Sequence, residues 1–329
     1  MDSVSSTRKR LIELLSNQEN KYISGQQLSE DLSISRSAVW KQMNHLKKDG
    51  YGIEAVENKG YRIVQLPEKV SENTVAWGLD TTWLGHHIIH KQTVASTQRL
   101  AHEVALDHSP HGTVIIADEQ TEAKGRVNRA WYSDKGTGMW MSFILRPAIL
   151  PYMAPQLTLL TATVLAEVLD ELTDVRPQIK WPNDILIQGK KVAGILTEMQ
   201  AEQDKIVYVI IGVGMNVNQL QTDFPDDIKD KATSLRAESN KKVELNLLIQ
   251  RFLEQFEKRY TAYIQEGFGG VKSSWENYGF RMNETLQITN GYQTWEGVFS
   301  GIAEDGALLA EKADGSLERV YSGEISWFT

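Results

Sequence analysis

The stretch of residues 123–131 concentrates positive charge around a glycine. Lys124, Arg126 and Arg129 lie within six residues of one another beside Gly125, and no acidic residue interrupts them. Long cationic side chains on a flexible backbone suit an anionic ligand that carries phosphate or carboxylate. The alternative for such a stretch is a flexible surface loop without a ligand.

A second candidate is Lys180, at the inner end of an apolar strand predicted for residues 178–181. An ammonium group in that position is costly unless an anion pairs with it. The anion is either a ligand or Asp184, which follows four residues later.

Two glycine-containing segments follow. Residues 189–196 predict a hairpin that brings Lys191 onto a strand where Gly194 permits close approach of another group. Residues 212–218 begin like a dinucleotide fingerprint, but they lack its third glycine and continue into asparagines, Asn216 among them, instead of a helix. A dinucleotide site is therefore rejected.

Other chemistries find little support in the composition. The chain of 329 residues has no cysteine, which excludes disulfides, thiolate metal sites and a cysteine nucleophile. It has no P-loop, zinc-protease motif or nucleophile elbow. Six histidines between residues 86 and 111 have spacings that fit no metal set, so no metal site is predicted.

The elements that must position these segments alternate between strand and helix patterns. Strands are predicted over 87–93, 113–117, 139–145, 178–181, 185–188, 192–199 and 206–213, and helices over 97–106 and 155–172. Several consecutive strands are separated only by tight turns, which requires antiparallel pairing. A mixed sheet in an α/β domain is expected, not a doubly wound parallel sheet.

Residues 1–66 have a different pattern. Three short amphipathic helices, the third over 36–48, precede a predicted hairpin, which is typical of a winged helix-turn-helix. The segment carries ten basic and eight acidic residues, hence +2, whereas the whole chain is −8. DNA contacts are predicted for the third helix and the hairpin, at Ser35, Arg36, Ser37, Lys41 and Lys59. The alternative is a solvated helix face in a protein-binding module.

Residues 243–265 predict a long amphipathic helix, and short strands with glycine turns follow from residue 284, which predicts a small β-barrel. The predicted organisation is a DNA-binding domain (1–66), a linker (67–73), a ligand-binding domain (74–278) and a C-terminal barrel (279–329). The polar, basic start and an apolar run of only eight residues, 206–213, predict a cytoplasmic protein without an export signal or membrane span.

Taken together, the segments resemble the biotin protein ligases, specifically the bifunctional kind that is also the biotin operon repressor. The resemblance is carried by residues 95–98, 119–131, 180–184, 189–196 and 212–218, with further matches at both ends of the chain. It departs from the family at Ala123, where a glycine is usual, and at Val127 and Asn128. It implies a central domain like class II synthetases and an SH3-like C-terminal barrel.

The resemblance also implies the chemistry. Biotin and MgATP give biotinyl-adenylate, and a lysine of a biotin carboxyl carrier protein domain then accepts the biotin. Such reactions depend on positioning and charge stabilisation. Biotin-binding residues implied by position are Ser96, Thr97, Gln98, Gln120, Lys124, Gly125, Arg126 and Lys180. Lys180 and Arg126 are the implied catalytic residues, and Arg129, Lys191 and Asn216 are placed on the nucleotide side.

Two other functions compete with this interpretation: a repressor that senses a ligand without turning it over, and a lipoate–protein ligase. The resemblance to the bifunctional ligases further implies binding to operator DNA of biotin genes, with the adenylate as corepressor promoting a homodimer. The strand over 192–199 is predicted to be a sheet edge that pairs in this dimer.

Overall fold

The computed structural model describes residues 3–16, 21–290 and 293–327. It forms two compact units: residues 1–80 together with 244–250, and residues 81–243 together with 251–329. The finer division into three domains and a linker stays a prediction.

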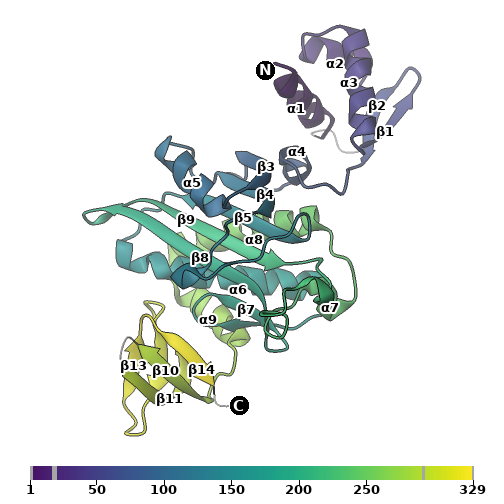
Figure 1. Cartoon of the computed structure of the whole chain (residues 1–329). Helices are drawn as coiled ribbons and strands as arrows, with labels where there is room; N and C mark the ends of the chain where they lie inside the picture. Colours follow the sequence, from purple (N-terminus) through teal and green to yellow (C-terminus); the bar gives the residue numbers. More distant parts are fainter. Residues whose placement is uncertain (1–2, 17–20, 291–292, 328–329) are drawn as a thin grey trace. The chain divides into compact units, whose positions relative to one another are not determined.

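The first unit contains the predicted three helices and hairpin (Figure 1). The helices are α1 (Ser3–Ser16), α2 (Gly25–Asp31) and α3 (Arg36–Lys48), and β1 (Gly52–Val56) pairs antiparallel with β2 (Gly60–Gln65). Their apolar faces form one core, in which Leu28, Val39 and Leu46 are fully buried. A short helix, α4 (Glu72–Ala76), was not predicted and begins within the segment expected to be a linker.

Serine caps define where the helices of this unit begin. The Ser24 hydroxyl accepts a hydrogen bond from the backbone N–H of Gln27, and the Ser35 hydroxyl accepts one from Ala38. A capping hydroxyl satisfies a backbone donor that has no partner within the helix. The cap explains why α3 begins at Arg36, as the sequence predicts.

The second unit is built on a seven-stranded mixed sheet, as predicted, in the order β3-β4-β5-β9-β8-β7-β6. Only β3 and β4 are parallel neighbours; the other pairs are antiparallel. The strands are β3 (Ile88–Val94), β4 (Val114–Gln120), β5 (Gly138–Leu145), β6 (Pro177–Lys180), β7 (Asp184–Ile187), β8 (Lys190–Glu202) and β9 (Lys205–Asn216).

Helices cover both faces of this sheet (Figure 1). On one face, α5 (Thr97–Leu106) packs on β4, β5 and β9 through Ala101 and Ala105. On the other, α6 (Ala154–Leu172) packs on β6, β7 and β8, and the Thr158 hydroxyl donates to that of Thr197 at 2.8 Å. Residues 151–172 are long and apolar enough to span a membrane, but 72% of their most apolar 18-residue window is buried in the protein, as in a core helix.

The prediction that residues 192–199 form a sheet edge is wrong for residues 192–194 and holds only from Leu196 onward. Strand β8 lies between β9 and β7, and β7 pairs with residues 190–194 of it. Beyond Ile195, strand pairing in the described chain involves β9 alone. The segment of β8 from Leu196 to Glu202 is therefore the part with a free edge, and we call it the open half of β8.

The remaining elements complete the second unit. Helices α7 (Leu235–Ser239), α8 (Leu245–Glu266) and α9 (Gly269–Tyr278) follow the large sheet, and the first residues of α8 belong to the first unit. The predicted C-terminal strands form a five-stranded antiparallel sheet in the order β13-β12-β11-β10-β14. They are β10 (Thr285–Asn290), β11 (Gln293–Ile302), β12 (Leu308–Glu311), β13 (Leu317–Val320) and β14 (Glu324–Trp327). Trp181 joins this sheet to the large one, because its Nε1–H donates to the carbonyl of Gly306 at 3.1 Å.

Candidate active site

A single large cavity of about 720 Å³ brings together the chemistry-bearing segments of the second unit. Its walls come from the start of α5, the ends of β4, β6 and β9, the middle of β5 and the first half of β8. The loop of residues 123–131, residues 224–232 and the strands β10 and β14 complete the lining. All eleven residues predicted to bind biotin or nucleotide line it: Ser96, Thr97, Gln98, Gln120, Lys124, Gly125, Arg126, Arg129, Lys180, Lys191 and Asn216.

The loop of residues 123–131 folds back on itself as a small hairpin. The backbone N–H of Gly125 donates to the carbonyl of Arg129 at 2.8 Å, and that of Trp131 donates to Ala123 at 2.9 Å. At its tip, Val127 and Asn128 have φ of 54° and 56°. This region is strained for residues other than glycine, most of all for a β-branched one. These are two of the positions at which the sequence is expected to depart from the pattern that it resembles.

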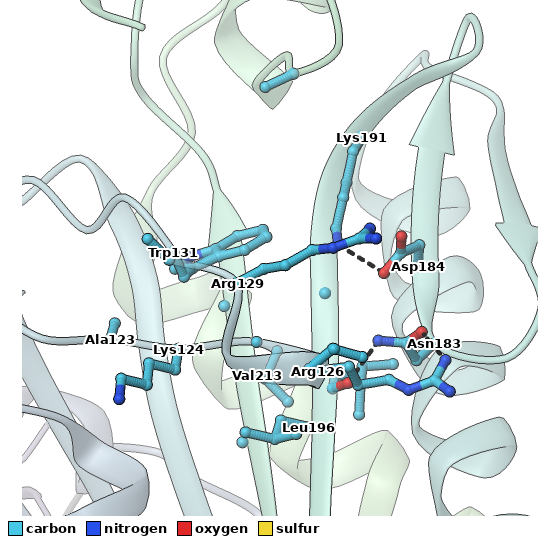
Figure 2. A pocket seen from close by; sticks show the side chains of 18 of the residues that line it. Ala123, Lys124, Arg126, Arg129, Trp131, Asn183, Asp184, Lys191, Leu196 and Val213 are labelled. Carbon is cyan, nitrogen blue, oxygen red and sulfur yellow. Dashed lines mark hydrogen bonds and ion pairs between the residues drawn. The ribbon is translucent and has the colours of Figure 1, made fainter. Parts of the chain in front are cut away.

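The cations of this loop point in different directions. Figure 2 shows Arg126 reaching Asn183, with its Nη1 donating to Oδ1 at 3.1 Å, and Arg129 extending toward Asp184 and Lys191. Lys124 points away from these groups (Figure 2). The loop therefore places one guanidinium at the β6–β7 turn and a second on the side of Lys191.

Trp131 lies flat against a pair of glycines that face each other on β8 and β9. A Cβ atom built on Gly214 would come within 2.6 Å of the indole Nε1, and one on Gly194 within 3.2 Å of the ring. Above the indole, Nζ of Lys191 lies 5.2 Å from the ring centroid. The two glycines are what admit the indole, as predicted for close approach at Gly194.

Lys180 and Asp184 lie opposite each other in the β6–β7 hairpin. Lys180 is half-buried and lines the cavity. The Asp184 carboxylate, considered as an alternative partner of Lys180, forms an ion pair with Lys191 at 2.7 Å. Two ammonium groups and two guanidinium groups, those of Arg126 and Arg129, thus surround one side of the cavity, which can stabilise a carboxylate or phosphate.

The other side of the cavity is uncharged and polar. Thr97 donates its backbone N–H to Oε1 of Gln120 at 2.8 Å, and its hydroxyl lies 2.9 Å from that of Ser142. The Ser142 hydroxyl donates to Oε1 of Gln98 at 3.1 Å. Ser96 is the N-cap of α5, but its hydroxyl makes no capping hydrogen bond. These groups can recognise a small polar ring.

Asn216 lines the cavity, but its side-chain amide is already hydrogen-bonded to neighbouring parts of the protein. Its Nδ2 donates to the carbonyl of Thr233 at 3.0 Å, and its Oδ1 accepts from Gln219 at 3.3 Å. Its position on the nucleotide side stays a prediction.

Three of the lining residues to which the sequence assigns no role make contacts that shape the site: Trp131, Ser142 and Asn183. Ser142 is the only polar residue of the otherwise apolar strand β5, a signal that was available. Trp131 and Asn183 were read as parts of motifs and were given no role. Their contacts with Gly214 and Arg126 join distant segments, which spacing does not reveal.

In the first unit, the predicted DNA-contacting residues are all exposed. Ser35, Arg36, Ser37 and Lys41 lie at the start of α3, and Lys59 lies in the turn between β1 and β2. The Ser35 hydroxyl is partly occupied by its capping bond.

Glu54 on β1 connects the two strands of this hairpin at its middle, opposite Arg62 on β2. Its carboxylate forms an ion pair with Arg62 at 2.6 Å. Hydrogen bonds from Arg62 and then Tyr22 lower the pKa of Glu54 below its ordinary value. The carboxylate therefore stays ionised and fixes the strands behind the turn that carries Lys59.

Three family models match the chain in order. They are an HTH domain over residues 7–62, the Biotin/lipoate A/B protein ligase family over 90–216, and the Biotin protein ligase C terminal domain over 285–327. The first covers the helices and hairpin of the first unit, and the second ends at Asn216, within the cavity.

Known proteins agree with these models. The Bifunctional ligase/repressor BirA of Bacillus subtilis is 46% identical over 98% of this chain and 98% of its own length. That of Escherichia coli is 28% identical over 96% of each. The structure of the biotin protein ligase from Aquifex aeolicus in complex with biotin and ATP has 30% identity and a TM-score of 0.63, covering 73% of this chain and 98% of that one. With this fold, cavity and winged helix, the chain belongs to the family of bifunctional biotin protein ligases and repressors.

Proposed function

We propose that the second unit activates biotin with ATP and transfers it to a lysine of a biotin carboxyl carrier protein domain. In the first step a biotin carboxylate oxygen attacks the α-phosphorus of ATP, giving biotinyl-adenylate and pyrophosphate. In the second, the lysine amine attacks the activated carbonyl, which forms an amide and releases AMP. The observation that carries this proposal is one cavity with a polar uncharged side and a cationic side.

The polar side fits the ureido ring of biotin. Thr97, Gln98 and Gln120 offer hydroxyl and amide groups there, next to Ser142. A buried polar ring is bound well only where each of its donors and acceptors finds a partner. The dithiolane of lipoate has no such donors, so this side of the cavity favours biotin.

The cationic side fits the carboxylate and the phosphates. Lys180 would hold the biotin carboxylate and later the phosphate oxygens, while Lys124, Gly125 and Arg126 close over ligand and intermediate. Arg129, Lys191 and Asn216 would face the nucleotide. Fixed cations at a site where negative charge develops stabilise the transition state without reorganisation.

Mg²⁺ would enter with ATP. Among the residues that the structure describes, no three His, Asp or Glu side chains form a metal-binding group. Mg²⁺ commonly takes most of its ligands from phosphate oxygens and water, with few from protein. The residues present fit this mode, with the phosphates supplying the ligands.

To test this, the protein is incubated with labelled biotin, MgATP and a carrier domain, and the label in the carrier domain is measured. The same incubation is repeated with labelled lipoate in place of biotin. Label in the carrier with biotin only is the expected result. Label from lipoate would assign the chain to lipoate ligation. A protein that binds biotin but shows no biotin-dependent ATP–pyrophosphate exchange would be a sensor without ligase activity.

Arg126→Gly is expected to leave adenylate formation measurable but to release the adenylate early. Its guanidinium anchors the loop to Asn183 and supplies a cation over the intermediate. Without it, the activated acid reaches bystander lysines, so self-biotinylation should rise several-fold. Mass spectrometry of the enzyme after turnover measures this. Self-biotinylation equal to that of the unchanged protein, with normal adenylate retention, would remove Arg126 from this role.

The first unit is a DNA-binding module, and we propose that it contacts operator DNA through Ser35, Arg36, Ser37, Lys41 and Lys59. The N-terminal part of the second helix of such a motif enters the major groove, and two half-sites bind best as a dimer. A net charge of only +2 on residues 1–66 makes a single copy a weak, non-specific binder. We propose that the protein is a cytoplasmic dimer, in which two copies of this unit bind two half-sites and together bind DNA more tightly than one copy.

The dimer would form through the open half of β8, since an unpaired strand edge accepts a second strand. Ordering of the 123–131 loop over biotinyl-adenylate would lower the cost of this pairing. A carrier domain would compete, by consuming the adenylate and by covering the same face.

Biotin together with ATP, but not biotin alone, is expected to increase both dimerisation and binding to the region upstream of biotin genes. Sedimentation and gel shifts measure the two effects, with Arg36→Ala as a variant that dimerises but binds DNA weakly. Identical monomer–dimer distributions and ligand-independent gel shifts would contradict the coupling.

A further inference from the structure

The polar side of the cavity contains a chain of four oxygen atoms in contact. From Oε1 of Gln120 it passes to the Thr97 hydroxyl (3.1 Å), the Ser142 hydroxyl (2.9 Å) and Oε1 of Gln98 (3.1 Å). Thr97, Ser142 and Gln98 are 3%, 0% and 8% exposed. At this burial, every unmet hydrogen-bonding group has a cost.

The orientation of both amides is determined by their neighbours. Gln120 must turn its oxygen to Thr97, because the backbone N–H of Thr97 can only donate. Gln98 must turn its NH₂ group away from Ser142, because that group faces three acceptors: Oε2 of Glu198 at 2.9 Å and the carbonyls of Leu196 and Ile210 at 3.4 and 3.5 Å. Glu198 supplies the short, charged contact.

With the amides of Gln120 and Gln98 fixed at its two ends, the row of four oxygen atoms has one proton too few. Four oxygens make three contacts, but only the two hydroxyls of Thr97 and Ser142 carry hydrogen, and amide oxygens only accept. Two protons cannot serve three oxygen–oxygen contacts. The chain therefore has an excess of acceptors, and a ligand that brings N–H donors satisfies it.

We propose that Glu198 is a positioning residue for biotin binding: it holds the Gln98 amide so that the pocket offers its acceptors to the ureido N–H groups. The proposal rests on the proposed function, since biotin is the ligand. Glu198 acts through Gln98, which lies between it and Ser142.

The surroundings of Glu198 support this role. It lies on the open half of β8, and the Oε2 atom that accepts from Gln98 also accepts from Nε2 of His102 at 3.0 Å. Gly212, across from Leu196 on β9, makes room for the amide, because a Cβ there would come within 2.5 Å of Oε1 of Gln98. The Glu198 carboxylate thus accepts from two donors, the Gln98 amide and the His102 ring, and it fixes the orientation of the buried Gln98 amide.

Glu198→Leu is expected to raise the KM for biotin about tenfold in ATP–pyrophosphate exchange, the effect of losing one charged hydrogen bond. The kcat and the KM for ATP should stay within about twofold, because the cationic side of the cavity is untouched. Glu198→Gln keeps an acceptor oxygen, so it should restore the KM for biotin to within about threefold of the unchanged protein.

Two further variants separate positioning from folding. Glu103→Leu makes the same change of charge at an exposed site on α5, the helix that carries Gln98, and should leave all constants unchanged. Ser142→Ala combined with Glu198→Leu should raise the KM for biotin no more than the larger single change, since both act on one chain.

Several results would overturn the proposal: an unchanged KM for biotin in Glu198→Leu, an equal loss of kcat, no rescue by Glu198→Gln, or additive effects with Ser142→Ala. These outcomes are distinct from failure of the proposed function. If the proposed function were wrong, the unchanged protein itself would show no biotin-dependent ATP–pyrophosphate exchange.

Discussion

Replacement of Lys180 by alanine is expected to lower biotin-dependent ATP–pyrophosphate exchange by about 100-fold or more. The ammonium group lines the cavity from the end of β6, beside the turn that Arg126 contacts through Asn183. Loss of one group that stabilises developing negative charge costs roughly 3 kcal/mol of transition-state free energy, which corresponds to this factor. Single-turnover formation of adenylate gives the rate directly.

The matched control is Lys205→Ala, which removes an exposed ammonium group at the turn between β8 and β9, outside the cavity. Both variants should unfold at the temperature of the unchanged protein, because neither side chain belongs to the core. Near-normal exchange in Lys180→Ala would exclude Lys180 from the reaction.

The second large effect is on stability. Glu257→Ala is expected to lower the free energy of unfolding by about 3 kcal/mol, or the midpoint by about 6–12 °C. The buried Glu257 carboxylate accepts four hydrogen bonds, three from the backbone N–H groups of Thr82, Trp83 and Leu84 and one from the Thr82 hydroxyl. Its removal leaves three backbone donors without partners. Thermal and urea unfolding measure the loss.

The pH dependence of the free energy of unfolding tests whether the Glu257 carboxylate is the stabilising group. Burial raises the pKa of Glu257, but the hydrogen bonds from residues 82–84 outweigh it, and the net pKa is lowered. A lowered pKa stabilises the fold above the ordinary pKa of glutamate, and this contribution is lost as the pH falls through the lowered value. The unfolding free energy of the unchanged protein should therefore fall more steeply below about pH 4 than that of Glu257→Gln.

Glu266→Ala provides the control for both measurements, since this residue is exposed at the end of the same helix. It should change the unfolding free energy by less than about 0.5 kcal/mol. A Glu257→Ala variant as stable as this control would contradict the assigned role of the carboxylate.

Local signals predicted much of this fold. Helix α3 runs from Arg36 to Lys48 as expected, because its cap, Ser35, directly precedes the thirteen residues that carry its buried stripe. Helix α9 was missed: it begins with Gly269 and Gly270, which disfavour a helix. Packing of the buried Val271 and Trp275 holds it, and tertiary burial of this kind is not visible in a short window.

The β8 prediction is wrong for residues 192–194 for a physical reason. Tight turns are expected on either side of this strand, at residues 188–190 and 202–204, and they pair it with β7 and with β9. Strand β8 therefore has no free edge over the length that β7 covers. Strand β7 has only four residues and β8 has thirteen. The difference in length, not the strand order, exposes the open half.

The cavity residues were found because their types are unusual in their settings, such as Lys180 at the end of an apolar strand. Glu198 was not found as a site residue, because its partner Gln98 lies a hundred positions away in the sequence, on a helix. Contact between them depends on how α5 packs on the sheet, and no local pattern encodes that packing.

Strand β5 gives the cavity two parts with different lifetimes. It pairs with β4 on one side and β9 on the other, and all eight of its residues are buried. Its amide protons exchange with solvent only when the whole sheet opens. Ser142 therefore keeps its place between turnovers, while the hairpin of residues 123–131, closed by few backbone hydrogen bonds, can open and re-form each time. We therefore expect the part of the site around Ser142 to persist from one turnover to the next, and the residence time of the ligand to depend on the opening rate of the loop.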